Sequence, residues 1–228
     1  MEDQDHPPPR HRHRASARTR RAFLFGAGAV VLGGVCIAAA SATDKISRTL
    51  PSTLRGPLPA RKEGEVDQTG AEWIAASDAN YRIAERPDDY MIDRVVIHVT
   101  QSTYPVALKV FEDPGHRAAA HYVVRARDGH VTQMVRELDV AYHAGNREWN
   151  ERSIGIEHEG FVDAPDRWFT DASYRASAQL CAAICARYGI PVDREHIVGH
   201  HEVPGTDHTD PGPYWDWDRY LRLVRAAV

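Results

Sequence analysis

The sequence predicts one α/β or α+β domain with a central mixed β-sheet flanked by helices. Short runs rich in β-branched residues, at 94–100, 153–157 and 197–198, alternate with stretches whose apolar residues recur at helical spacing. In addition, Asp128-Gly129 separates two further strand-like runs and indicates a hairpin. We therefore expect parallel and antiparallel pairs within one sheet.

The first half of the domain contains three predicted features. Residues 94–100 form a buried strand, because apolar and β-branched side chains dominate them. Residues 105–111 form a short helix that ends before Pro114-Gly115. The runs 121–125 and 130–135 are the two arms of the hairpin.

The second half adds strands and two helices. Residues 153–157 form another central strand, and residues 197–198 form a short one. A helix is expected from Asp171, which can cap its N-terminus, to about Tyr188, and a last helix follows Asp216. The apolar stripe and the stop signals of the longer helix are Ala176, Leu180, Ile184, Tyr188, Gly189 and Pro191.

Composition limits the classes of function. The chain has 228 residues and 43% hydrophobic content, which is enough for a packed core. Residues 1–42 contain six arginines and three acidic residues, a net charge of +3. The remaining residues include 22 basic and 29 acidic residues, a net charge of −7, and the two parts add up to the −4 of the whole chain. An acidic domain gives no support for nucleic-acid binding.

Two of the three cysteines lie in the predicted helix over 171–188. Cys181 and Cys185 are four residues apart, so they share a helix face, but a helix does not bring such a pair into disulfide geometry. We expect buried thiols.

The N-terminus is predicted to be an export signal over residues 1–42. Arg20-Arg21 followed by Phe23-Leu24 resembles a twin-arginine motif, an uncharged stretch follows, and Ala40-Ser-Ala42 is a cleavage signal. The mature protein is then expected to be secreted, with no membrane association after cleavage. The alternative is an uncleaved anchor over residues 22–42; the residues before Cys36 fit a lipoprotein site poorly.

The rest of the chain is expected to divide into a linker and one domain. Residues 43–70 contain Pro, Ser and charges with little periodicity, which is typical of a flexible linker. Residues 71–228 are predicted to form the catalytic domain.

A cluster of histidines and carboxylates suggests a metal site. His98 lies inside an apolar strand, where a polar ring needs hydrogen bonds or a metal. The Gly- and Pro-rich segment 199–212 supplies further imidazoles and carboxylates. Two His and one carboxylate suit a catalytic Zn²⁺ with one open position. Spacing alone does not decide between His200 and His201, which project in opposite directions in an extended chain.

A general base is also expected. Glu157 follows an apolar strand, where its carboxylate could take a proton from an activated water. Glu159 has the same strand parity and competes for this role, and either residue could simply be solvated at the strand end.

Short motifs in a fixed order resemble the zinc-dependent N-acetylmuramoyl-L-alanine amidase family, which includes phage amidase lysozymes and peptidoglycan recognition proteins. Each motif is short, but their ordered combination over about residues 73–228 is specific. They are Val95-Val-Ile-His98, Ala120-His-Tyr-Val-Val124, Asp128-Gly129, Ala141-Tyr-His-Ala-Gly145, Ser153-Ile-Gly-Ile-Glu157, Gly199-His200 and Asp210-Pro-Gly-Pro213 with Asp216-Trp217.

The resemblance implies a role for each matched position. Zinc ligands fall on His98, His200 and Asp210, at one edge of the sheet. The catalytic carboxylate falls on Glu157. His208 stands where many relatives have Lys, and it could stabilise an oxyanion but would lose its charge near neutral pH. Pocket positions fall on His121, Tyr122 and His143.

The implied reaction is hydrolysis of the amide between N-acetylmuramic acid and L-alanine, with peptidoglycan or muropeptides as the partner. One alternative is a peptidoglycan-binding module without activity, although all three ligand positions carry competent residues. Another is a secreted zinc peptidase or a metal nuclease, but the chain contains no H-E-x-x-H motif and is acidic.

Overall fold

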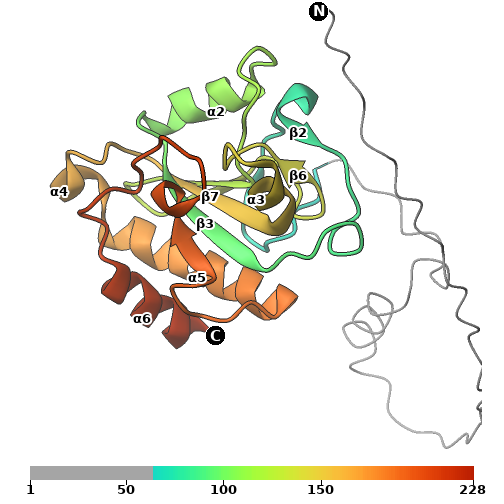
Figure 1. The fold of residues 1–228 in the computed structure, drawn as a ribbon. Helices are drawn as coiled ribbons and strands as arrows, with labels where there is room; N and C mark the ends of the chain where they lie inside the picture. Colours follow the sequence, from blue (N-terminus) through green and yellow to red (C-terminus); the bar gives the residue numbers. More distant parts are fainter. Residues whose placement is uncertain (1–63) are drawn as a thin grey trace, which may run out of the picture.

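A computed structural model describes residues 64–228, which fold around a six-stranded sheet with helices on both faces (Figure 1). The strand order is β1-β5-β4-β7-β3-β8, and β2 pairs with β6 in a separate two-stranded sheet. The strands are β1 (Glu72–Trp73), β2 (Tyr81–Arg82), β3 (Arg94–Val99), β4 (Tyr122–Val124), β5 (Val131–Gln133), β6 (Val140–Ala141), β7 (Ser153–His158) and β8 (Ile197–Gly199).

The sheet is mixed, as predicted. β7, β3 and β8 run parallel to one another, and β4 joins β7 in parallel. β4 and β5 form the predicted antiparallel hairpin. Its turn needs a glycine at Gly129, because φ is +72° there and a Cβ would lie 2.6 Å from the carbonyl oxygen of Ala172.

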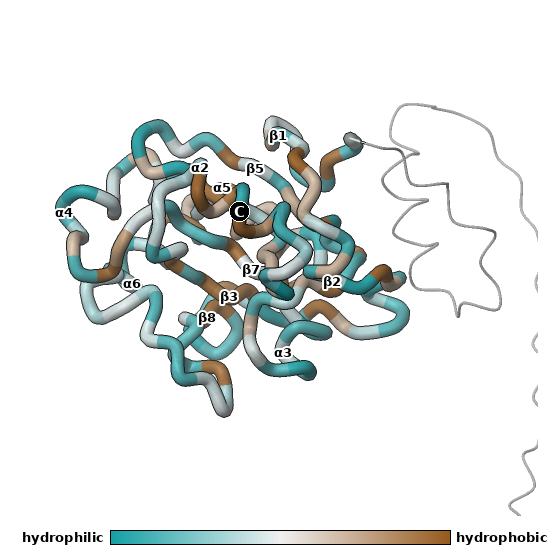
Figure 2. Tube along the Cα trace, turned by 90° about the horizontal axis from the view of Figure 1, so that it is seen from above, coloured by the Kyte–Doolittle hydropathy of each residue, from teal (hydrophilic) through white to brown (hydrophobic). Residues whose placement is uncertain are grey.

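Two helices, α5 (Asp171–Tyr188) and α6 (Trp217–Ala227), cover one face of the sheet (Figure 1). Alternate residues of β3 and β7, among them Ile97 and Ile156, pack against them in the largest core cluster. Figure 2 shows this pattern as hydrophobic central strands surrounded by hydrophilic loops. The long apolar stripe of α5 therefore faces the sheet.

The N-cap of α5 corrects one expectation. Thr170, not Asp171, is the cap: its hydroxyl accepts a hydrogen bond from the Ser173 N–H at 3.1 Å. Asp171 lies in the first turn, where its negative charge interacts favourably with the positive N-terminal end of the helix dipole. The end at Gly189 agrees with the prediction, since this residue is left-handed with φ +72°.

The opposite face carries less regular structure. α2 (Tyr104–Glu112) packs there through Ala107 and Phe111. The remaining helical segments are not predicted by the sequence. The α-helical ones have only four to six residues and the 3₁₀ turns have three, which is too few for a periodic signal. They are α3 (Arg147–Arg152), α4 (Pro165–Trp168), η2 (Asp78–Asn80) and η3 (His200–Glu202).

The folded domain begins before the predicted boundary at residue 71. The N–H of Asp67 donates to Gln133 at 2.7 Å, and its carboxylate accepts from the N–H of Glu137 at 2.8 Å. Residues 67–70 therefore belong to the domain and not to the linker. The expected signal over residues 1–42 and most of the expected linker lie outside the described residues.

Two further expectations concern helices. Cys181 and Cys185 are buried free thiols, as predicted. Among the helices of residues 64–228, none is long and apolar enough to cross a membrane.

The buried carboxylate of Glu137 connects α5 to β4 through hydrogen bonds and an ion pair. Glu137 is fully buried, and its oxygens accept hydrogen bonds from Tyr122 and Tyr188, both at 2.7 Å. Arg187 completes the cluster with an ion pair at 2.5 Å. Because an isolated buried charge is costly, Arg187 should stabilise the domain.

We therefore expect Arg187→Met to lower the free energy of unfolding by about 3 kcal/mol, since it removes the cation that pairs directly with the buried Glu137 carboxylate. Urea denaturation monitored by circular dichroism measures this difference. Arg175→Met, at an exposed position of the same helix, is the control and should change stability by less than about 0.5 kcal/mol. Equal effects of the two substitutions would contradict the assignment.

Candidate active site

Three parallel strands end at one place and carry the key residues there. His98 lies near the carboxyl end of β3, Glu157 lies near the end of β7, and His200 follows β8 directly. The register places His98 directly opposite Glu157. Because side chains alternate along a strand, both point to the face that α5 and α6 leave uncovered.

Asp210 comes from the segment after η3 and closes the cluster. Its carboxylate lies 3.4 Å from Nδ1 of His98 and 3.2 Å from Nδ1 of His200. The N–H of Val99 also donates to this carboxylate, at 3.2 Å, which fixes it against β3. His98, His200 and Asp210 are all buried, and one ligand atom of each lies within 4.8 Å of the others. Among residues 64–228, they are the one such group of His, Cys, Asp or Glu that could hold a metal.

Protonation in this cluster suits metal binding. Burial lowers the pKa of His98 to about 4, so its ring is neutral at neutral pH. Burial opposes ionisation of Asp210, but the adjacent His200 and His98 bring its pKa below the usual range. A neutral imidazole and an ionised carboxylate are the forms that coordinate a cation.

The structure separates His200 from its neighbour. His200 is buried in the cluster, whereas His201 is exposed and uses its Nδ1 and its N–H on the backbone oxygen of Asp210, at 3.1 and 3.0 Å. Gly199 allows this tight arrangement, because a Cβ there would lie 2.7 Å from both the His201 ring and Pro211.

Glu157 and Glu159 occupy different environments. Glu157 is half-buried beside the cluster, and its Oε2, which is shielded from solvent, makes no hydrogen bond within the described part of the chain. Burial, reinforced by Asp210, raises the pKa of Glu157 well above its usual range. Both oxygens of Glu159 instead accept backbone N–H groups, of Tyr104 at 2.9 Å and Ala126 at 2.8 Å. Glu157 is thus available for chemistry and Glu159 is not.

His208 stands at the rim of the cluster. Its side chain is 58% exposed, and its Nδ1 lies 3.5 Å from Asp210. Its ring stacks on that of His200 with centroids 4.0 Å apart. A solvent-facing imidazole therefore lies directly next to the buried groups.

A pocket of about 550 Å³ opens onto these residues. Glu157, His200, His208 and Asp210 line its polar side. Small and apolar side chains line the other side, from α2 and from the segment 118–120. The pocket can therefore hold a ligand that presents both a polar group and an apolar part.

The structure corrects two of the three predicted pocket positions. His121 and Tyr122 are completely buried and do not line the pocket. His121 Nδ1 accepts from the N–H of Gly155 at 3.0 Å, and the hydroxyl of Tyr122 is bonded to Glu137 on the opposite face of the sheet. Neither side chain reaches the surface of the pocket in this structure. His143 does line the pocket, although it is only 7% exposed.

Some residues that shape the site carry no signal in the sequence. Arg86 is 1% exposed and donates to the carbonyls of Asn150 and Ser153, at 3.3 and 2.8 Å. The side chain of Asn150 in turn accepts from the N–H groups of His143 and Ala144, at 3.1 and 2.7 Å. These contacts join residues far apart in sequence, so no local pattern reveals them.

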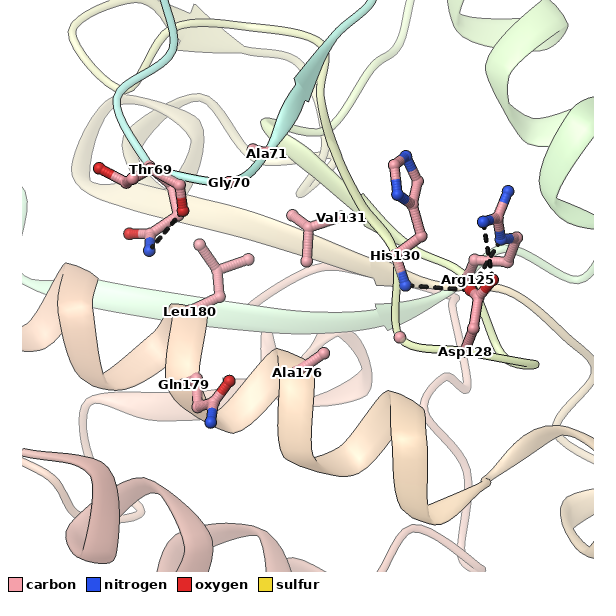
Figure 3. Close-up of a pocket in the computed structure, with 12 residues that line it drawn as sticks. Thr69, Gly70, Ala71, Arg125, Asp128, His130, Val131, Ala176, Gln179 and Leu180 are labelled. Carbon is pink, nitrogen blue, oxygen red and sulfur yellow. Dashed lines mark hydrogen bonds and ion pairs between the residues drawn. The ribbon is translucent and has the colours of Figure 1, made fainter.

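A second pocket, of about 440 Å³, shares no lining residue with the first. Figure 3 shows it between Gly70 and Ala71 on one side and α5 on the other. Its charged residues Arg125 and Asp128 pair with each other at 2.8 Å. The candidate metal cluster is in the first pocket.

Comparison with known proteins identifies relatives of this arrangement. The sequence model of the family described as N-acetylmuramoyl-L-alanine amidase (Amidase_2) matches residues 88–213. N-acetylmuramoyl-L-alanine amidase A of Achromobacter lyticus is 35% identical over 179 residues, which cover 71% of this chain and 97% of the relative. The 1,6-anhydro-N-acetylmuramyl-L-alanine amidase AmpD of Haemophilus influenzae is 37% identical over 48% of this chain and 60% of its own length.

Solved structures agree with the sequence relatives. A selenomethionine AmpD derivative superimposes with a TM-score of 0.58 at 28% identity, covering 73% of this chain and 99% of the other. The amidase AmiD of E. coli, in complex with anhydro-N-acetylmuramic acid-L-Ala-D-γ-Glu-L-Lys, has a TM-score of 0.50 at 29% identity, covering 58% and 57%. With its fold, its ordered motifs and its relatives in agreement, the chain belongs to the N-acetylmuramoyl-L-alanine amidase family.

Proposed function

We propose that this protein hydrolyses the amide bond between N-acetylmuramic acid and L-alanine in peptidoglycan or muropeptides, with Zn²⁺ held by His98, His200 and Asp210. One observation carries the proposal: His98 and His200 lie at the ends of adjacent parallel strands, Asp210 joins them from the loop after η3, and Glu157 lines the same pocket. The names of the relatives and the muropeptide bound to AmiD support the substrate class.

The spacing of the three residues fits zinc. Bonds of about 2.0–2.1 Å at tetrahedral angles separate neighbouring ligand atoms by about 3.3 Å. Nδ1 of His98 lies 3.4 Å from Oδ2 of Asp210 and Nδ1 of His200 lies 3.2 Å from Oδ1, and one ligand atom of each residue lies within 4.8 Å of the others, so small shifts would bring the three around one ion. Three protein ligands leave a fourth position free, as a catalytic centre requires.

Glu157 acts as the general base in this proposal. When bound, zinc polarises the scissile carbonyl and lowers the pKa of a water molecule. The Glu157 carboxylate accepts the proton of the attacking water and passes it to the leaving amine of L-alanine. Partial burial, reinforced by Asp210, raises the pKa of Glu157 and makes it a stronger base than a fully exposed carboxylate.

His208 is the group we assign to the oxyanion. It lies at the rim next to Asp210 and is free to turn toward the pocket. An N–H donor at this place stabilises the negative charge that develops on the carbonyl oxygen. A His143 contact with substrate is less favoured, because that ring is nearly inaccessible.

The site of action in this proposal is the cell wall. Residues 1–42 carry the twin-arginine-like pattern and the Ala40-Ser-Ala42 cleavage signal, which would export the folded enzyme. An uncleaved anchor over residues 22–42 would instead hold the same domain at the membrane.

Mass spectrometry of peptidoglycan digested with and without a chelator tests the proposed reaction. We expect free N-terminal alanine on the released peptides, loss of this product after zinc removal, and recovery when zinc is added back. Cleavage between peptide residues, with muramyl-alanine intact, would instead identify a peptidase. Binding of peptidoglycan without any cleavage by the zinc-loaded protein would identify a binding module.

Glu157→Gln is expected to lower turnover by about 10²- to 10⁴-fold while zinc content stays the same, because the base is lost and the ligands remain. Product release and zinc content measured on one sample check this. The control is Glu159→Gln, which replaces one of the two oxygens that accept backbone N–H groups with a donor; it should lower the melting temperature but not the turnover of the folded protein. If Glu159→Gln were the inactive variant, the roles would be reversed.

His208→Ala is expected to lower turnover by about 10²-fold, the usual cost of removing one oxyanion donor. His208→Lys should retain most of the activity, since an ammonium donates in the same place. Zinc affinity is measured alongside, because His208 stacks on His200. Full activity of His208→Ala at unchanged zinc content would exclude this role.

A further inference from the structure

A hydrogen-bonded chain leads away from the candidate metal cluster. His98 directs Nδ1 toward Asp210, and its other ring nitrogen, Nε2, lies 2.9 Å from Nδ1 of His143. His143 Nε2 lies 3.1 Å from the hydroxyl of Ser153. That hydroxyl donates to the backbone carbonyl of Trp149. His98, His143 and Ser153 are all buried.

The backbone carbonyl of Trp149, at the end of this series of hydrogen bonds, determines which atom donates in each of them. A carbonyl can only accept, so the one hydroxyl proton of Ser153 goes to Trp149. Ser153 must then accept from His143, which places the proton of the neutral His143 ring on Nε2. Burial favours the neutral form of both rings.

The protonation of His143 in turn determines that of His98 in the candidate metal cluster. With its proton on Nε2, His143 offers a lone pair at Nδ1, and His98 must donate to it from Nε2. The neutral His98 ring is left with a bare Nδ1, which faces the Asp210 carboxylate at 3.4 Å. A lone pair and a carboxylate repel unless a cation lies between them, so this tautomer is the one that a metal requires.

Gly155 provides the space for His143. A Cβ at this position of β7 would lie 2.6 Å from Cγ and 2.7 Å from Nδ1 of His143. The ring thus rests directly on the backbone of the strand, two residues before Glu157. The side chain of Asn150 holds the backbone of His143 from the other side.

We infer that His143 is a positioning residue: together with Ser153 it fixes the tautomer and the ring orientation of His98, so that Nδ1 presents its lone pair to the metal. This inference rests on the zinc site of the proposed function and replaces the expectation that His143 contacts substrate. Outer partners of this kind typically change metal affinity by about 10- to 100-fold.

The test is the zinc affinity of the full chain, measured by competition with a fluorescent chelator, for matched variants at His143. His143→Leu fills similar space without an acceptor, so its affinity should fall by at least about tenfold. His143→Asn places an oxygen close to the position of Nδ1 and should stay within about threefold of the wild-type affinity, on the same scale. The melting temperature of each metal-free variant separates loss of folding from loss of the acceptor.

Ser153→Ala keeps the test decisive if His143→Leu does not fold. It removes the acceptor that fixes the His143 tautomer and should weaken zinc binding several-fold, that is, less than His143→Leu. Ser177→Ala is the matched control, because Ser177 is also buried and hydrogen-bonded but contacts Tyr220 in the α5–α6 core. Its zinc affinity should equal that of the wild type.

The outcomes separate the inference from the proposed function. Wild-type protein that binds no zinc would overturn the zinc site, and the inference with it. Wild-type binding together with unchanged affinity in folded His143→Leu and Ser153→Ala would overturn the inference alone. Equal losses in His143→Asn and His143→Leu, with both folded, would also overturn it, because the acceptor would then be irrelevant.

Discussion

The parallel pairing of β3 with β7 is the interaction on which the rest of the site depends. It sets His98 opposite Glu157 and so brings an imidazole and a carboxylate together from residues far apart in the chain. Because the two strands are central in the sheet, neither residue can move without disturbing neighbours on both sides. β8 extends the same parallel arrangement by one strand, and His200 follows it immediately. Asp210 then needs only a hydrogen bond from Val99 to complete the group.

The sheet also separates stability from chemistry. One face packs against α5 and α6 through a large apolar cluster, and the other carries the polar groups of the pocket. This division explains why the adjacent residues His121 and Tyr122 have different surroundings. His121 lies against the ring of His143 on the side of the pocket, whereas Tyr122 donates a hydrogen bond to Glu137 on the opposite face.

Much of this organisation could be predicted from the sequence, for physical reasons that differ between residues. The strands around residues 94–100 and 153–157 and the helix over 171–188 have strong periodic patterns, and all three were predicted. The residues that meet at the site could be named because their motifs occur together in known amidases. The partners of His143 and the buried Arg86 could not, because such contacts arise only once distant segments pack. The N-cap at Thr170 and the domain start near Asp67 were misplaced by a few residues, which is the usual uncertainty of boundaries.

The hydrogen bond between Val99 and Asp210 joins positions 111 residues apart, so it closes a loop that contains most of the domain. Synthesis of the chain therefore delivers the last ligand only after the sheet, α5 and β8 have emerged. The three candidate ligands therefore come together only in a chain that has been synthesised past Asp210 and has folded.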